Sequence, residues 1–279
     1  MSRTAVFVLA PDFPQLDGCE MIAGPYDASL AAAQLLGYDG VEIIMGDPDE
    51  FDAADFKRLL EQYGLGIAAI NSGGIQYKLA ANLVDKDERK MELALCKLRR
   101  NIQHCHELGC LQQVGVVRGF AVPGRPMRWF KDRLVAILKD AAAYAARLNV
   151  GIAFEYTNRF EINTINTGAE AREIVDRIGA NNVGILIDTG HSFIEDPDVY
   201  QNILDLRDYV RHFHLHDSHG GAALIGGGEN NFERIVENCG QIGYRGWFSD
   251  GLHTTKYAED GIRLSTTGLR QLYRKYGLR

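Results

Sequence analysis

The chain has 279 residues, of which 46% are hydrophobic and 24% are charged, and its formal net charge is −7. This length and composition are typical of one large globular domain. The negative charge argues against nucleic acid or an anionic membrane as a partner. No stretch approaches the roughly 18 consecutive apolar residues of a membrane-spanning helix.

The first apolar run of the chain is short. It covers only Ala5–Ala10, whereas a secretory signal peptide needs a longer apolar core and a small-residue cleavage site. We therefore expect a first strand here and no leader. The five cysteines are an odd number and show neither a CxxC motif nor zinc-ligand spacing. They predict reduced thiols in a cytoplasmic protein.

Eight short apolar runs alternate with eight amphipathic stretches, which predicts alternating strands and helices. The predicted strands are Thr4–Ala10, Gly40–Met45, Gly66–Asn71, Leu111–Val117, Val150–Tyr156, Val183–Asp188, Val210–His216 and Arg245–Asp250. The predicted helices are Tyr26–Leu36, Ala53–Tyr63, Glu88–Leu108, Phe130–Leu148, Ala169–Ile178, Val199–Leu206, Phe232–Ile242 and Ile262–Tyr276.

This strict alternation indicates an α/β fold with right-handed crossovers and a parallel sheet. Eight units favour a closed (β/α)8 barrel, the TIM barrel, over an open doubly wound sheet with extra strands. No linker, low-complexity tract or charge block interrupts the alternation. We therefore expect a single barrel domain over residues 1–279.

Three predicted strands each end in a polar residue: Glu155, Asp188 and His214. Because the carboxyl ends of barrel strands meet at one mouth, these side chains should converge there. Residues two apart share a face, so Ala153 should lie beneath Glu155 and His212 beneath His214. Each polar residue alone could equally be a helix cap or a hydrogen-bonded loop residue. Together, two carboxylates and an imidazole predict a site for one divalent cation.

Hard oxygen ligands with one imidazole favour Mn²⁺, and Mg²⁺, Co²⁺ and Zn²⁺ also fit. Such a cation can bind two adjacent oxygens of a hydroxy-ketone and stabilise an enediolate while a carboxylate moves the proton. The sequence therefore predicts an enzyme that abstracts a proton next to a carbonyl.

Four segments carry a likeness to known enzymes. They are GIAFEYTNRFEINTINTGAEAREIV, NNVGILIDTGH, RHFHLHD and GGGENNFERIVENCGQIGYRGW. The chain resembles the xylose-isomerase-like barrel family of sugar isomerases and epimerases, and within it the D-tagatose 3-epimerase group, through E-x-x-N-R-F-E and L-I-D-T-x-H. By this likeness Glu155, Asp188 and His214 match metal ligands, and Glu155 also matches one of two acid/base carboxylates. Glu161 and His191 match positions that contact substrate hydroxyls.

The predicted eighth strand departs from the family pattern G-W-x-x-x-E. The final Glu of that pattern is the fourth ligand and the second acid/base group, but here Gly251 takes its place and Asp250 lies one residue early. A one-residue slip turns a strand side chain to the other face. A bulge at Gly251 would redirect Asp250 toward the cation as ligand and acid/base group. The alternative is a site with three protein ligands and a water.

Residues at other strand ends and in loops are further candidates for the site. Glu42 and Asn71 end the second and third strands, and we expect them to bind substrate, with loop capping as the alternative for each. Arg118, after strand four, is either a ligand for a substrate carboxylate or a solvated charge. The segment Asp217–Glu229 contains no Lys or Arg, so we expect an unphosphorylated substrate.

These observations predict a metal-dependent isomerase or epimerase acting on an unphosphorylated ketose, polyol-derived ketone or keto-sugar. A dehydratase or lyase acting on an inosose or keto-sugar begins with the same proton abstraction and stays open as the alternative. A barrel subunit with an incomplete site is the third hypothesis. The resemblance also implies a homo-oligomer, either a dimer or a tetramer.

Overall fold

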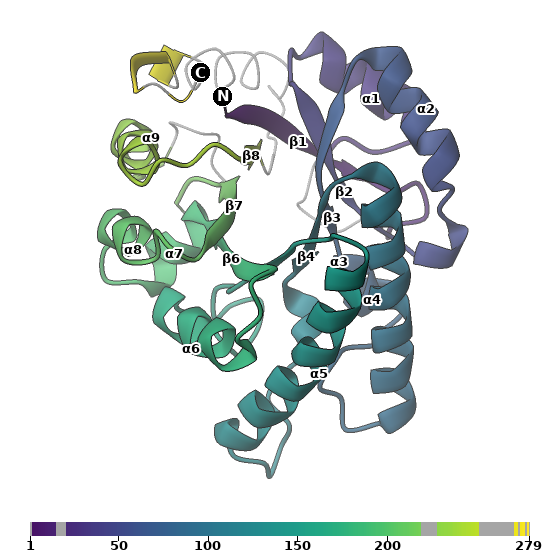
Figure 1. Ribbon diagram of the computed structural model, residues 1–279, viewed down its shortest axis with the longest axis vertical. Helices are drawn as coiled ribbons and strands as arrows, with labels where there is room; N and C mark the ends of the chain where they lie inside the picture. The colour runs from purple at the N-terminus through teal and green to yellow at the C-terminus, as the bar shows by residue number, and fades with distance from the viewer. Residues whose placement is uncertain are drawn as a thin grey trace.

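The fold was analysed in a computed structural model that describes residues 2–14, 21–218, 228–250, 271–272, 274–276 and 278. Within these ranges, eight parallel strands close into a barrel in sequence order, because β1 pairs with both β2 and β8 (Figure 1). The strands are β1 (Arg3–Leu9), β2 (Gly40–Ile44), β3 (Gly66–Asn71), β4 (Leu111–Val114), β5 (Ile152–Glu155), β6 (Val183–Asp188), β7 (Val210–Leu215) and β8 (Trp247–Asp250). The predicted (β/α)8 barrel is confirmed.

Helices surround the strands on the outside of the barrel (Figure 1). They are α1 (Tyr26–Leu35), α2 (Ala53–Tyr63), α3 (Gly73–Tyr77), α4 (Glu88–Leu108), α5 (Met127–Arg147), α6 (Gly168–Ile178), α7 (Thr189–Glu195), α8 (Val199–Asp205) and α9 (Phe232–Gln241), with 3₁₀ turns η1 (Pro48–Glu50) and η2 (Val116–Arg118). Among the helices that the structure describes, none is long and apolar enough to cross a bilayer.

The structure differs from the predicted elements after β3 and β6, at the end of β4 and near the C-terminus. The short helices α3 and α7 follow β3 and β6 directly and are too short to show helical periodicity. Strand β4 ends at Val114, because Gly115 starts the turn η2. Most of the predicted helix Ile262–Tyr276 lies outside the described residues; of it, 271–272 and 274–275 are helical.

Side chains on alternate strand positions separate into two layers. Val6, Ile43, Phe154 and Phe213 point outward and pack with helix residues in one large buried cluster. At the N-terminal end of the barrel, Trp247 packs with two alanines in a separate cluster. A Cβ at Gly40 or at Gly66 would approach the Trp247 ring to 2.6 or 2.8 Å. This end of the barrel is therefore a packed core.

Candidate metal centre

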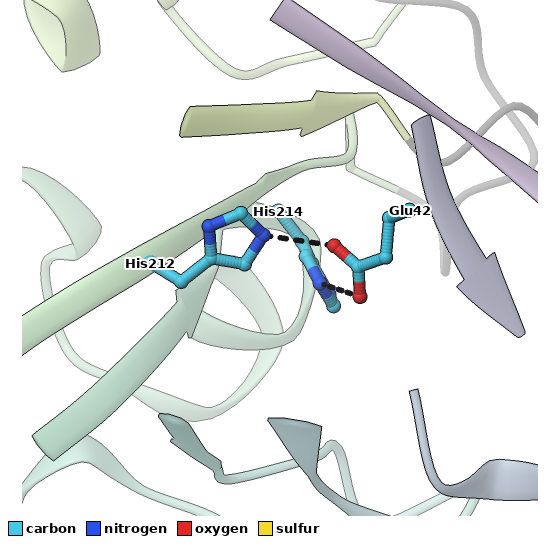
Figure 2. Close-up of side chains that lie close together, drawn as sticks. All are labelled: Glu42, His212 and His214. Atoms are coloured by element: carbon cyan, nitrogen blue, oxygen red, sulfur yellow. Dashed lines mark hydrogen bonds and ion pairs between the residues drawn. The ribbon is translucent and has the colours of Figure 1, made fainter. Parts of the chain in front are cut away.

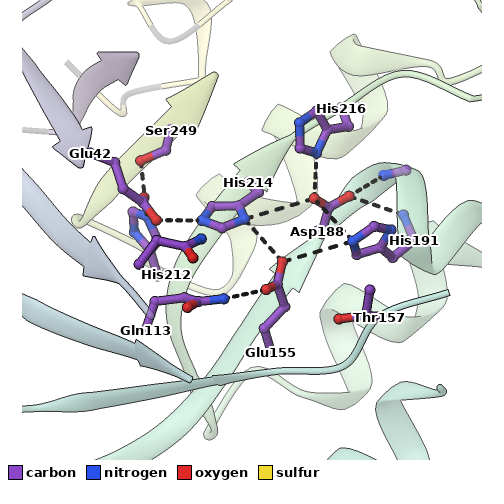
Figure 3. Close-up of polar contacts among 12 residues, drawn as sticks. Glu42, Gln113, Glu155, Thr157, Asp188, His191, His212, His214, His216 and Ser249 are labelled. Carbon is purple, nitrogen blue, oxygen red and sulfur yellow. Dashed lines mark hydrogen bonds and ion pairs between the residues drawn. The ribbon is translucent and has the colours of Figure 1, made fainter. Parts of the chain in front are cut away.

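The three predicted ligands meet at the carboxyl end of the barrel. Glu155 and Asp188 are the last residues of β5 and β6, and His214 lies near the end of β7 (Figure 3). His214 Nδ1 lies 3.1 Å from Glu155 Oε1 and 3.8 Å from Asp188 Oδ2. Ligand atoms about 2 Å from one small cation lie about 3–3.5 Å apart. Donor types and spacing therefore fit a single divalent cation after small adjustments.

Asp188 is held by the first turn of the helix that follows it. Its Oδ1 accepts hydrogen bonds from the backbone N–H groups of Gly190 and His191, at 2.8 and 3.0 Å, so it caps α7. Its Oδ2 faces the cluster and accepts a hydrogen bond from His216 Nδ1. Burial alone would raise the pKa of Asp188, but His191 and His216 hold it well below its usual range. The helix cap thus leaves one carboxylate oxygen directed at the site.

Glu155 is oriented by an amide on the neighbouring strand. Gln113, on β4, donates a hydrogen bond from Nε2 to Glu155 Oε2, and its own Oε1 accepts from the Ser72 backbone at 3.1 Å. A Cβ at Gly115 would collide with this Glu155 oxygen, so only glycine leaves room for the carboxylate. Gln113 was not predicted from the sequence. Its signal is a polar residue at a buried position of an apolar run.

The network around His191 fixes which ring nitrogen carries the proton. Asn158 Oδ1 accepts from the Phe160 backbone at 2.9 Å, so its Nδ2 is the donor to Glu161 Oε1 and to His191 Nδ1, each also at 2.9 Å. His191 Nε2 therefore carries the hydrogen in the neutral ring. That N–H lies 4.0 Å from Glu155 Oε1 and 3.9 Å from an oxygen of the Asp188 carboxylate. This arrangement suits a hydrogen-bond donor to a substrate oxygen better than a metal ligand.

His214 also contacts a second, deeper carboxylate. Its Nε2 lies 3.0 Å from Glu42 Oε1, while Glu42 Oε2 lies 2.8 Å from His212 Nε2 (Figure 2). Burial alone would lower the pKa of His214, but Glu42 and Glu155 raise it well above its usual value. With no cation bound, a protonated His214 would bridge the two carboxylates. A cation bound at Nδ1 would replace the proton on that nitrogen.

The other residues predicted to contact substrate are Glu42, Asn71 and Glu161, and they do not all lie at the barrel mouth. Glu42 is fully buried with both oxygens bonded to histidines, so it is not exposed at the mouth. Asn71 Oδ1 accepts from the Gly73 backbone at 2.8 Å, which is the capping alternative. Glu161 keeps 40% of its side chain exposed, 3.9 Å from His191 Nδ1. Of these three, only Glu161 adjoins the site with an accessible carboxylate.

The structure does not bring Asp250 to the cluster, contrary to its predicted role as ligand and acid/base group. The ladder between β7 and β8 runs without a register shift, and Asp250 pairs with Leu215 and Val6, both of the outer layer. Its Oδ2 accepts a hydrogen bond of 2.8 Å from Tyr38. Gly251, where a bulge was considered, lies outside the described residues. Ser249 holds the inward position, 3.0 Å from His212 Nε2.

Arg118 supports the structure and has neither predicted role, as a ligand for a substrate carboxylate or as a solvated charge. Its side chain is fully buried and donates to the backbone carbonyls of Glu155, Thr164 and Ile165, at 2.8–3.1 Å. These bonds tie η2 to the loop after β5. Arg118 therefore supports the strand end that carries Glu155 and leaves no charge at the mouth for a substrate carboxylate.

Comparison with known proteins places this chain in a family. Residues 30–272 match the model of the xylose isomerase-like TIM barrel, and the chain belongs to that family. A ketose 3-epimerase from Arthrobacter globiformis is 28% identical over 240 residues, which cover 82% of this chain and 80% of the relative. An L-ribulose 3-epimerase from Methylomonas sp. (strain DH-1) is 30% identical over 220 residues, covering 78% of this chain and 75% of the relative.

Solved structures agree on the fold. A 3-keto-D-glucoside 4-epimerase from E. coli superposes with a TM-score of 0.81 at 22% identity, covering 97% of this chain and all of the other. A D-allulose 3-epimerase from Methylomonas sp. superposes with a TM-score of 0.79 at 22% identity, covering 98% of this chain and 99% of the other. The predicted resemblance to sugar epimerases of this barrel family is confirmed.

Proposed function

We propose that this chain is a divalent-cation-dependent sugar epimerase or isomerase that abstracts a proton next to a carbonyl. Its substrate is an unphosphorylated ketose, a polyol-derived ketone or a keto-sugar. The observation that carries the proposal is the convergence of Glu155 Oε1, Asp188 Oδ2 and His214 Nδ1 at the barrel mouth. The relatives named as ketose and L-ribulose 3-epimerases support the same class of reaction.

Glu155, Asp188 and His214 would hold the cation. Two carboxylates and one imidazole suit Mn²⁺, and the same set accepts Mg²⁺, Co²⁺ or Zn²⁺. When bound, the cation would polarise the substrate carbonyl and stabilise the negative charge that develops on its oxygen. Three protein ligands leave coordination positions for substrate oxygens.

The surrounding side chains would supply the proton chemistry and the orientation. Glu155 is the proposed base, and Gln113 fixes its Oε2 so that Oε1 faces the substrate side. His191 would donate its Nε2–H to a substrate oxygen, because Asn158 occupies the other ring nitrogen. Glu161 would accept a hydrogen bond from a substrate hydroxyl, since its carboxylate is partly exposed beside His191.

One observation favours the dehydratase or lyase alternative. Epimerisation returns a proton from the opposite face and needs a second group, but β8 presents Ser249 inward and turns Asp250 toward Tyr38. Elimination of a leaving group from an inosose or keto-sugar needs only the first abstraction and a proton for the leaving oxygen. A subunit whose site is completed by a second copy remains the third hypothesis.

Proton exchange with solvent tests the proposal directly. The Mn²⁺-loaded protein is incubated in D₂O with ketoses, inososes and 3-keto-sugars, and each mixture is quenched with chelator before NMR. We expect deuterium next to the carbonyl of at least one recovered sugar. A new stereoisomer identifies an epimerase, and an unsaturated or deoxy product identifies a lyase. No deuterium in any member of the panel would count against proton abstraction from these classes.

Three further predictions accompany this function and rest on the sequence. We propose Mn²⁺ as the cation used in the cell, a cytoplasmic location, and a homo-oligomer of two or four copies. Metal analysis of the purified native protein tests the first. Fractionation of cells tests the second, and light scattering of the purified protein tests the third.

A further inference from the structure

Glu42 lies one layer below the proposed cation site, in the middle of a fully buried group. His212 and His214 both project inward from β7 and direct their Nε2 atoms at opposite oxygens of the Glu42 carboxylate (Figure 2). Glu42 and His212 have no exposed surface, and His214 has 1%. A carboxylate in this position can neither reach a substrate in the mouth nor exchange readily with solvent.

His214 joins this buried group to the proposed ligands. One ring nitrogen faces Glu42 Oε1 at 3.0 Å, and the other faces Glu155 Oε1 at 3.1 Å (Figure 3). If Nδ1 binds a cation, it must offer a lone pair, so the remaining ring hydrogen is on Nε2. Glu42 is then the acceptor for that hydrogen. Carboxylates that accept from the second nitrogen of a ligating histidine fix its tautomer and orientation and make it a better donor.

We infer that Glu42 is a positioning residue, which holds the Nε2–H of His214 so that Nδ1 is directed at the cation. This assignment replaces the predicted contact between Glu42 and substrate, and it rests on the cation site of the proposed function. His212 donates a hydrogen bond to the other carboxylate oxygen and so keeps the plane of the Glu42 carboxylate fixed. His212 Nδ1 has no hydrogen-bond partner among the residues that the structure describes, so Nε2 is the nitrogen that carries its hydrogen.

A second cation is the competing explanation for the same three residues. One donor atom from each of Glu42, His212 and His214 lies within 4.8 Å of the others. Such a cation would need lone pairs on the Nε2 atoms of both histidines. For His214 that would demand a fully deprotonated ring bridging two cations. The positioning role needs only neutral rings and uses every contact present, and so we prefer it.

The first test reads the tautomer in the wild-type protein. The chain is labelled with ¹⁵N-histidine and loaded with Zn²⁺, a diamagnetic probe, and the ring nitrogens are assigned by NMR. We expect Nε2 of His214 to carry a hydrogen-bonded proton while Nδ1 shows the shift of a metal-bound nitrogen. A proton on Nδ1, with the metal on Nε2, overturns the inference. Because no residue is changed, this test does not depend on the folding of a variant.

The second test measures cation affinity by chelator competition in Glu42→Gln, Glu42→Asp and wild type. An amide has one acceptor oxygen, so its NH₂ group would face one of the two N–H donors that now point at opposite oxygens of Glu42. We therefore expect Glu42→Gln to bind one Co²⁺ or Zn²⁺ per chain about 10–100-fold more weakly, with a changed Co²⁺ visible spectrum. Glu42→Asp keeps the charge and should recover part of the affinity. Asp250→Asn is the matched control, because it neutralises another buried carboxylate and should leave affinity and spectrum unchanged.

The outcomes separate this inference from the proposed function. Unchanged affinity and spectrum in Glu42→Gln overturn the positioning role, and two cations per wild-type chain that fall to one identify a second metal site instead. A wild-type chain that takes up no cation overturns the proposed site itself. A chain that shows the expected affinity loss but exchanges no proton with any sugar keeps the inference and overturns only the proposed reaction.

Discussion

Strands β6 and β8 both end in a buried aspartate, yet the two carboxylates lie in opposite environments. Asp188 points into the barrel, where its oxygens meet the first turn of α7 and the histidines of the site. Asp250 points outward, where its partner is the Tyr38 hydroxyl. The same residue type at the same strand end thus belongs to the candidate metal centre in one case and to the packing between barrel and helices in the other. Alternate positions of a strand face opposite sides, so the position of each aspartate decides whether its side chain points into the barrel or toward the helices.

The two environments have opposite effects on ionisation. The histidines around Asp188 hold its pKa well below the usual range despite burial. Around Asp250 burial prevails over the Tyr38 hydrogen bond and the charge of His216, and it raises the pKa to about 6. One carboxylate is therefore kept charged and available to a cation, and the other keeps its proton up to a higher pH. Four predictions can break or sharpen this contrast, and they are ordered by expected effect.

Asp188→Asn should have the largest effect. The amide loses the charge that a hard cation requires and presents either its oxygen or its NH₂ group to the site. We expect cation affinity to fall by more than about 100-fold and proton exchange to be lost with it. Metal content after dialysis and exchange in D₂O measure both. Asp250→Asn is the control and should keep both properties; equal losses in the two variants would show that Asp250 acts at the site after all.

Asp250 should make the apoprotein less stable as the pH rises from 4 to 6. Its pKa is raised from 3.8 to about 6 on folding, so the unfolded chain releases the proton first while the folded chain retains it. Stability from this group is complete below pH 4 and falls by up to about 3 kcal/mol as the pH reaches 6. Urea unfolding of wild type and Asp250→Asn, in chelator, isolates this dependence. Parallel stability curves across this range would contradict the buried environment of Asp250.

The sequence predicted the barrel and the three converging ligands because both depend on local regularities. Alternating strands and helices define the topology, and the parity of Glu155, Asp188 and His214 directs them to one side of the strands. Asp250 was placed inward only by assuming a bulge after it. The ladder continues without one to the last described residue of β8, so parity alone, applied strictly, would have turned Asp250 outward.

Contacts between distant segments could not be predicted in this way. Glu42 and His212 are 170 residues apart, and nothing in either segment indicates that the carboxylate meets two imidazoles inside the barrel. Gln113 likewise reaches Glu155 from a neighbouring strand. Such pairs follow from the stagger of the strands around the barrel, which sets the height of each inward residue and is not encoded in the hydrophobic pattern of any one strand.

His216→Gln should weaken the site moderately. His216 donates to the same Asp188 oxygen that faces the proposed cation, so its loss frees that carboxylate to rotate and removes a nearby hydrogen-bond donor. We expect about 10-fold weaker cation binding at unchanged stoichiometry. His106→Gln is the control, because His106 is exposed and bonds only the Leu148 carbonyl in the described structure. An affinity change of the same size in both variants would remove His216 from the support of Asp188.

Tyr38→Phe should have the smallest effect and should act on stability alone. The Tyr38 hydroxyl donates to the buried Asp250 at 2.8 Å, and its loss leaves a carboxylate without this donor. We expect a loss of about 1 kcal/mol in the free energy of unfolding at pH 8. At pH 5 the loss should be smaller, because a protonated Asp250 depends less on a donor.

Tyr63→Phe provides a matched comparison for that substitution. Tyr63 donates to Asp27 at the same distance of 2.8 Å, but this pair is exposed. Water replaces the lost donor there, so we expect a change within about 0.5 kcal/mol at either pH. If Tyr38→Phe were as mild as Tyr63→Phe, or if it lowered cation affinity, Asp250 would not be the buried, outward-facing carboxylate that separates β8 from β6.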